Sequence, residues 1–109
     1  MKNLNTVLAE VAVNGVVVYP FIETETIRNL SATSLNLDTR SSNALRRSGI
    51  KTIGELLDRI PELGKIHGLG AKSKSKIMYE LCAFNYSSLD DKRKKDYLMK
   101  IIKLNTERR

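Results

Sequence analysis

The sequence predicts an all-α fold, a compact bundle of four or five short helices, from three observations. Apolar residues recur at helical spacing from residue 38 onward, residues suited to helix N-caps precede these stretches, and glycine or proline ends them. The chain has 109 residues, of which 41% are apolar, and it contains no tryptophan. This composition is sufficient for one modest core of leucine, isoleucine and valine.

The first 34 residues are the least regular part of the sequence. Leucines and valines follow helical spacing over residues 4–12, and Asn14-Gly15 would then end a helix. The same Asn-Gly pair lies between two valine-rich runs, which is the pattern of a β-hairpin with a tight turn. Because valine is β-branched, the hairpin is favoured. Residues 1–34 are therefore expected to be irregular or a short β-hairpin, with residues 23–36 as a polar linker.

Helix signals are much clearer in the next segment, residues 35–86. Asp38 is a suitable N-cap for a helix of about ten residues. Residues 52–55, Thr-Ile-Gly-Glu, form a capping box, in which the hydroxyl and the carboxylate satisfy each other's free backbone amides. Pro61 ends the helix that this box begins, and a longer helix is expected over about residues 71–83.

An additional basic helix is expected over residues 87–109, where lysines surround a narrow apolar side. That apolar side should pack on the rest of the molecule and consists of Tyr97, Leu98, Ile101 and Ile102. The expected parts of the chain are an N-terminal segment with a linker, a helical domain and this extra helix, at residues 1–34, 35–86 and 87–109.

Charge indicates the class of partner. The formal net charge is +7, and residues 37–109 hold 17 basic against nine acidic residues. A surplus of this size favours a polyanion, either nucleic acid or an anionic membrane surface. No apolar run approaches the roughly 20 residues of a membrane span, and the N-terminus lacks the pattern of a signal peptide. We therefore expect a cytoplasmic protein that has no membrane partner.

Several kinds of chemistry are not expected. Cys82 is the single cysteine, so no intramolecular disulfide can form, and with one histidine a Cys/His zinc site is excluded as well. Cys82 itself is expected to pack as a small hydrophobic side chain. No pair of catalytic base and nucleophile and no carboxylate cluster is visible. The sequence therefore predicts neither a cofactor, a metal nor an enzyme activity.

The most specific local pattern is Leu-Gly-Lys-Ile-His-Gly-Leu-Gly-Ala-Lys-Ser-Lys-Ser-Lys-Ile, residues 63–77, which resembles a helix-hairpin-helix motif. Gly68 and Gly70 would let the backbone turn tightly and approach a ligand closely. The helix that follows presents free N–H groups, to which Lys72 and Ser73 add a charge and a hydroxyl. This combination predicts phosphate contact, and the alternative is that both glycines only shape an interhelical turn.

The helix after Asp38 carries a second candidate set of DNA-contacting residues. Helical spacing places Arg40, Asn43 and Arg47 on one side. Arginine and asparagine are suited to groove edges and phosphates. An ordinary solvated polar face is the alternative explanation of the same spacing.

Two separated stretches resemble the C-terminal domain of the bacterial RNA polymerase α subunit. The first is Leu-Asn-Leu-Asp-Thr-Arg-Ser-Ser-Asn-Ala-Leu-Arg-Arg-Ser-Gly-Ile-Lys-Thr-Ile-Gly-Glu-Leu at residues 35–56, and the second is Leu-Gly-Ala-Lys-Ser at residues 69–73. The resemblance covers about residues 35–84. It implies binding to the minor groove of A·T-rich double-stranded DNA upstream of promoters, in the bacterial nucleoid, by a non-catalytic module.

The resemblance also implies individual contacts. The family's groove arginine falls on Arg40, its asparagine on Asn43, and its hairpin glycine, lysine and serine on Gly70, Lys72 and Ser73. Two positions depart from the family pattern, because the family's cysteine and glutamate are Ala44 and Lys76 here. The expected DNA-binding residues are Arg40, Asn43, Arg47, Gly68, Gly70, Lys72, Ser73 and Lys76.

Two other functions fit the same sequence. One is a protein-docking module for a transcription factor or for polymerase, and the other is a general helix-hairpin-helix DNA-binding module of repair or recombination. The 34 residues before the first stretch are not expected to hold the α subunit's assembly domain. Since the basic helix and the valine-rich start lie outside the family pattern, a stand-alone relative is favoured over a fragment of a subunit. The oligomeric state is left open.

Overall fold

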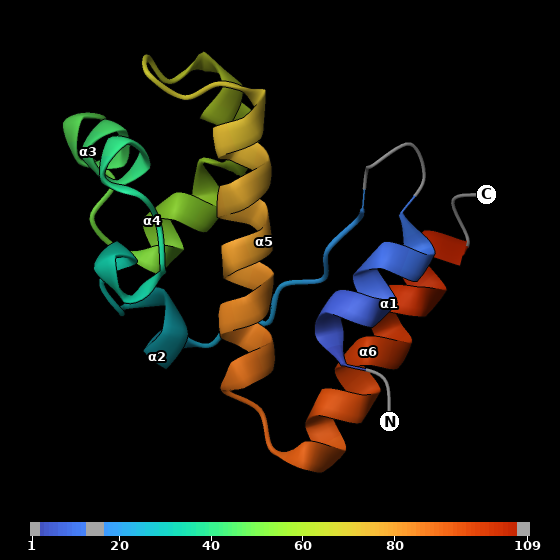
Figure 1. Cartoon of the computed structure of the whole chain (residues 1–109). Coiled ribbons are helices and arrows are strands. Elements are labelled where there is room, and N and C mark those ends of the chain that lie inside the picture. Colours follow the sequence, from blue (N-terminus) through green and yellow to red (C-terminus); the bar gives the residue numbers. More distant parts are fainter. Residues whose placement is uncertain (1–2, 13–16, 107–109) are drawn as a thin grey trace. The chain divides into compact units, whose positions relative to one another are not determined.

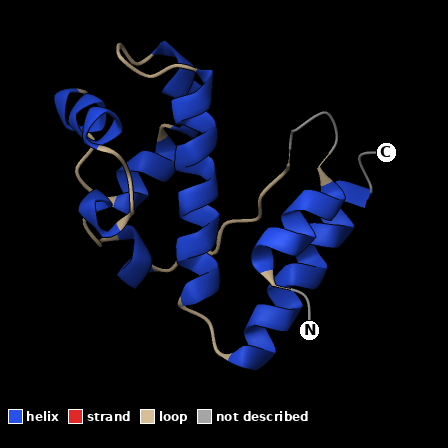
Figure 2. Cartoon of the chain, in the orientation of Figure 1, coloured by secondary structure: helices blue, strands red, loops and turns tan. Residues whose placement is uncertain are grey.

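Figure 1 shows the computed structural model, which describes residues 3–12 and 17–106. Over these residues the protein is helical and forms no strand (Figure 2), so the all-α prediction is confirmed. The elements in sequence order are α1 (Leu4–Val11), α2 (Glu25–Arg28), the 3-10 turn η1 (Ala32–Ser34), α3 (Thr39–Arg47), α4 (Ile53–Asp58), the 3-10 helix η2 (Ile60–Lys65), α5 (Ala71–Ser87) and α6 (Asp91–Thr106).

The chain divides into two compact units. Residues 22–81 form the first, which we call the central unit, and residues 1–21 with 82–109 form the second, which we call the flanking unit. The boundary between the two units falls within α5. The three-part division expected at residues 34 and 86 stays a prediction.

The helix ends of the central unit follow the predicted caps. The side chain of Asp38 begins α3, and Gly49, with a φ of 81°, follows its end. Both hydrogen bonds of the capping box of α4 are present: Thr52 Oγ1 accepts from Glu55 N at 3.1 Å, and Glu55 Oε1 accepts from Thr52 N at 3.1 Å. The central core consists chiefly of Leu45, Ile53, Leu56, Leu63 and Ile77.

The expected linker at residues 23–36 is wrong, because this segment holds α2 and η1 and packs on α4. A methyl group at Gly54 would lie 2.9 Å from Cβ and 3.0 Å from the carbonyl oxygen of Arg28, so only glycine permits this approach. The guanidinium of Arg28 also pairs with Glu23 at 2.5 Å and with Asp58 at 2.7 Å. Long-range contacts therefore order a segment whose composition is typical of a linker.

In the flanking unit, α1 packs along α6. Leu4, Val7, Leu8 and Val11 are buried, as the apolar side of a helix would be. The preference for a β-hairpin is therefore wrong where the structure describes its first run, since Val11 ends α1; the Asn14-Gly15 pair lies outside the described residues. Burial of four apolar side chains outweighs the weak β-preference of valine, since each contributes about 1.5–3 kcal/mol.

Two buried side chains hold the extended residues 17–21 against α6. Asn105 accepts a hydrogen bond from Val18 N at 2.8 Å and donates to Val18 O at 2.9 Å, as a neighbouring strand would. Its amide nitrogen also donates to Ile101 O at 2.8 Å. The Tyr97 hydroxyl donates to Pro20 O at 2.6 Å, and Tyr97 and Cys82 are both buried. Burial is the main cause that raises the pKa of the Tyr97 hydroxyl.

Candidate nucleic-acid interface

Helix α3 presents the first group of predicted DNA-binding side chains. Arg40 and Arg47 are exposed, whereas Asn43 is half-buried. The opposite side of the helix is anchored by Leu45, which is 2% exposed. Since no hydrogen bond or ion pair within the described residues engages the guanidinium of Arg40 or Arg47, both remain available to an anion.

Asn43 has a hydrogen-bond partner that was not predicted from the sequence. Its side-chain oxygen accepts a hydrogen bond from Nη2 of Arg46, one turn further along α3. The i,i+3 spacing of these two residues is a signal that would have found the contact. Asn43 is therefore positioned by Arg46.

The N-cap of α3 lies among positive charges. The backbone N–H of Ser41 donates to Oδ1 of Asp38 at 2.7 Å, and this hydrogen bond lowers the pKa of the Asp38 carboxyl. The charges of Arg40 and Lys76 lower that pKa further. The carboxylate thus stays ionised and lies within the electrostatic reach of cations from both α3 and α5.

The hairpin before α5 packs directly on α3. Gly68 has a φ of 91°, which a residue with a side chain rarely adopts. A methyl group built there would lie 3.4 Å from Nη2 of Arg47 and 3.7 Å from Cβ of Ala44. The structure therefore brings the predicted groove helix and the predicted phosphate hairpin together at Gly68.

Gly70 differs from Gly68. Its φ is not positive, and a methyl group there would meet nothing within 4 Å. The tight turn therefore depends on Gly68 and not on Gly70. A glycine that the fold does not require is consistent with close approach of a ligand to the backbone, as the phosphate hypothesis expects.

The first two turns of α5 carry three of the predicted residues. Lys72 is exposed and makes no hydrogen bond or ion pair within the part of the protein that the structure describes, and Ser73 is half-buried. Lys76 is instead paired with Glu80 at 3.1 Å and lies 5.9 Å from the ring centroid of Tyr79. Lys72 is therefore the more available cation.

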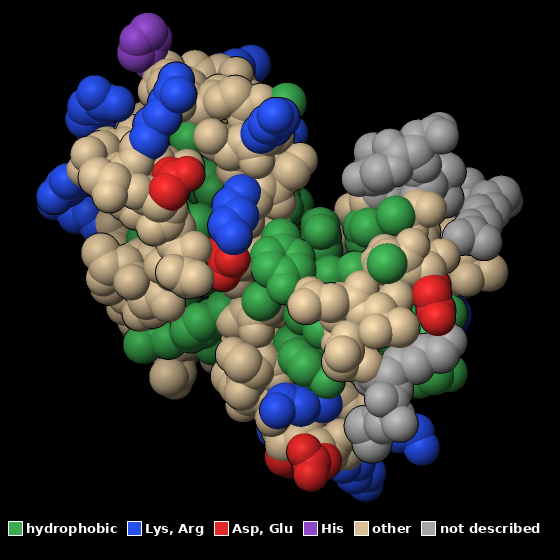
Figure 3. Space-filling model, viewed as in Figure 1, with side chains coloured by type: hydrophobic (Ala, Val, Ile, Leu, Met, Phe, Trp, Pro, Cys, Tyr) green, Lys and Arg blue, Asp and Glu red, His purple; other side chains and the backbone are tan. Residues whose placement is uncertain are grey.

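The positive side chains gather on one part of the central unit. Figure 3 shows Lys and Arg side chains grouped over α3 and the turn that precedes α5. In the described residues, no group of three or more His, Cys, Asp and Glu side chains could hold a metal ion. Nor is any described helix long and apolar enough to cross a membrane.

A capped helix packed on a glycine hairpin, which itself leads into a second helix, defines a small helical module of the helix-hairpin-helix type. Residues 22–82 match the family of the C-terminal domain of the bacterial RNA polymerase alpha subunit, and the protein belongs to this family. The domain is a non-catalytic part of a polymerase subunit, so the protein is a transcription-related module. The match includes α2 and η1, which lie in the segment predicted to be a linker.

Three relatives show the extent of the similarity, and each is a DNA-directed RNA polymerase subunit alpha. The protein of Symbiobacterium thermophilum is 36% identical over 66 residues, which is 60% of this chain and 21% of the relative. That of Limosilactobacillus reuteri is 39% identical over 77 residues, 68% of this chain and 24% of the relative. That of Mycoplasmopsis synoviae is 50% identical over 48 residues, 43% of this chain and 14% of the relative.

The matched region thus spans between 14% and 24% of the length of these three relatives. No solved structure matches the protein. The family match ends at residue 82, so α6 lies outside it.

Proposed function

We propose that the central unit binds double-stranded DNA, with a preference for A·T-rich sequence, through the minor groove and the flanking phosphates. The observation that carries this proposal is the packing of Arg47 and Ala44 against Gly68, which makes α3 and the hairpin one continuous surface. A single docking event could then bring α3 to the groove and the hairpin to the backbone. Polymerase-associated transcription in the bacterial nucleoid is the setting that the family suggests.

Arg40 and Lys72, two of the unengaged cations of the candidate site, have different functions in this proposal. Arg40, exposed on α3, enters the groove, where a narrow A·T tract has an enhanced negative potential. Lys72, in the first turn of α5, meets a phosphate together with Ser73 and the backbone at Gly70. Lys76 is held by Glu80 and contributes less.

Arg40→Ala is expected to reduce affinity for A·T-rich duplex by roughly 1–3 kcal/mol and to flatten the preference over G·C-rich duplex. Lys72→Ala is expected to weaken binding to both duplexes about equally and to make the slope of log K against log salt shallower by about one. Binding isotherms for each protein on both duplexes at two salt concentrations measure these changes.

The matched control is Arg40→Lys, which keeps the charge but loses the planar fork of donors. It should retain non-specific binding and lose part of the A·T preference. An A·T preference that survives Arg40→Ala would rule out the groove assignment and favour the protein-docking function. Binding that is indifferent to sequence in the unsubstituted protein would favour a general helix-hairpin-helix module.

A further inference from the structure

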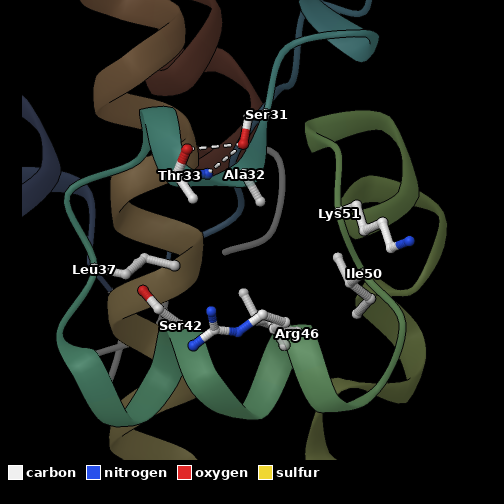
Figure 4. Close-up of a pocket in the computed structure, with 9 residues that line it drawn as sticks. Ser31, Ala32, Thr33, Leu37, Ser42, Arg46, Ile50 and Lys51 are labelled. Atoms are coloured by element: carbon white, nitrogen blue, oxygen red, sulfur yellow. Dashed lines mark hydrogen bonds between the residues drawn. The ribbon is translucent and has the colours of Figure 1, made fainter.

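A half-open pocket of about 300 Å³ lies in the central unit, apart from the hairpin (Figure 4). Three segments enclose it: residues 31–37, the middle of α3, and residues 50–51 just before α4. Figure 4 shows their side chains on different sides of one hollow. Its nine lining residues are Ser31, Ala32, Thr33, Leu37, Ser42, Leu45, Arg46, Ile50 and Lys51.

The chemistry of the lining is apolar with cationic edges. Leu45 and Ile50 are 2% and 3% exposed and belong to the core, so they offer a fixed apolar wall. Arg46 and Lys51 add two positive charges, from α3 and from the segment before α4. No carboxylate lines the pocket to neutralise them.

The hydroxyl groups that line the pocket differ in whether they already make a hydrogen bond. The oxygens of Ser31 and Thr33 lie 2.7 Å apart and bond each other. Ser42 is half-buried, and its hydroxyl makes no hydrogen bond within the described residues. Ser42 and Arg46 are one helical turn apart on α3 and both line the pocket, so the two can offer donors to one oxygen-bearing group.

We propose that this pocket binds a small organic anion with an apolar body and one carboxylate head group. The apolar wall takes the body, and the guanidinium of Arg46 takes the carboxylate, a match in which two parallel hydrogen bonds can form. The volume lies at the lower end of the roughly 300–1,000 Å³ typical of ligand pockets, which suits a short aliphatic tail or a single ring. Lys51 adds long-range attraction for the negative charge.

The pocket is connected to the proposed DNA surface through one side chain. Arg46 donates to the side-chain oxygen of Asn43, a predicted DNA-binding residue. An anion that engages Arg46 competes with this hydrogen bond and frees Asn43 to change rotamer. Ligand binding should therefore alter DNA affinity, and by linkage DNA should alter ligand affinity by the same factor. This second step rests on the proposed function, whereas the ligand site itself does not.

The site is tested on the full-length protein by NMR, with hexanoate as the probe and hexan-1-ol as its neutral counterpart, at constant ionic strength. Hexanoate is expected to shift backbone amides of residues 31–37 and 42–51 saturably and to bind at least about fivefold more tightly than hexan-1-ol. Absence of a saturable shift, or equal binding of the alcohol, would overturn the proposal, the latter because the pocket would then be apolar without anion selectivity.

Arg46→Ala and Lys51→Ala distinguish the contribution of the ligand's carboxylate head group to binding from that of its apolar body. Both substitutions should weaken the binding of hexanoate, Arg46→Ala more strongly than Lys51→Ala. The binding of hexan-1-ol should remain unchanged. Lys65→Ala, at an exposed lysine that does not line the pocket, is the matched charge control and should leave both probes unchanged. Equal weakening of hexanoate by all three variants would indicate only a general charge effect and would overturn the site.

DNA titrations with and without saturating hexanoate test the coupling, with Arg46→Ala as the uncoupled reference. A change in DNA affinity in the unsubstituted protein that is absent in Arg46→Ala supports it. No change in the unsubstituted protein overturns the coupling and leaves the site intact. A protein that binds no DNA overturns the proposed function and the coupling together, while the hexanoate titration still decides the site.

Discussion

The central unit and the flanking unit carry similar surpluses of positive charge but arrange them differently. The central unit holds ten basic and seven acidic residues, and the flanking unit holds nine and five. The central cations come from several elements, and Arg47 of α3 lies at the glycine turn before α5, whereas most flanking cations lie along the one helix α6. Net charge alone therefore does not distinguish a candidate groove-binding surface from a basic helix. The local backbone that carries the cations distinguishes the two.

The two units also differ in what holds them together. In the central unit, side-chain caps and a close approach at Gly54 fix short helices. In the flanking unit, two helices pack lengthwise, and the side-chain amide of Asn105 replaces a strand as partner for residues 17–21. Central stability should thus depend on helix caps and on the close approach of α2 to α4, and flanking stability on contacts between segments from the two ends of the sequence.

The most severe change is deletion of residues 87–109, which removes α6 and the partner of α1. Burial of Tyr97, Leu98 and Ile101 would be lost, at about 1.5–3 kcal/mol for each side chain before the compensating gain in conformational entropy. We expect a markedly lower Tm and, by NMR, dispersed amide signals only from residues 22–81. An unchanged Tm would show that α6 contributes nothing to stability and would erase the distinction between the units.

Asn105→Ala tests the flanking unit without shortening it. The substitution removes three hydrogen bonds and leaves the N–H and C=O of Val18 without partners. We expect the free energy of unfolding to fall by about 3 kcal/mol in chemical denaturation. Asn36→Ala, at an exposed asparagine, is the control and should have little effect. Equal losses in both variants would contradict the anchoring function of Asn105.

Gly54→Ala tests the close approach in the central unit. The added methyl group would lie 3.0 Å from the backbone oxygen of Arg28, so α2 must shift away from α4. The expected loss is about 2 kcal/mol of unfolding free energy, from the strain of overpacking. Gly64→Ala is the matched control, because a methyl group there meets nothing within 4 Å. Should Gly54→Ala be as stable as Gly64→Ala, the packing of α2 on α4 is not tight.

The smallest expected effect concerns the capping box of α4. Thr52→Ala removes the acceptor for the backbone N–H of Glu55 and should cost about 1 kcal/mol. Thr52→Ser keeps the hydroxyl and should restore most of that stability. Thermal unfolding of both variants measures the difference, and an equal Tm for the two would mean that the cap contributes nothing.

The sequence predicted most of the central unit because its signals are local. The cap at Asp38 and the capping box at residues 52–55 each lie within one turn of the helix they begin, and both were found. The four-residue helix α2 was missed because its order depends on Gly54, about 25 residues later. In the N-terminal segment, helix and hairpin patterns coexist, and only the presence of α6 as a partner selects the helix.

The candidate site was predicted at the level of residue type and of the helix or turn that carries each residue. Exposure of Arg40, Arg47 and Lys72 agrees with that prediction, and their function remains a proposal. The contact of Arg47 with Gly68 joins two motifs about 20 residues apart, and no spacing within either motif shows it. The pairing of Lys76 with Glu80, in contrast, follows from their i,i+4 spacing.

The pairing of α1 with α6 has a consequence for the order in which the protein folds during synthesis. Val18 and Asn105 are 87 residues apart, so α1 leaves the ribosome long before its partner exists. Translation adds roughly 5–20 residues per second, which leaves the apolar side of α1 uncovered for several seconds. The central unit can fold in that interval, and once folded it shortens the loose segment that must close. Early folding of the central unit would thus speed the packing of α1 on α6, which are synthesised several seconds apart.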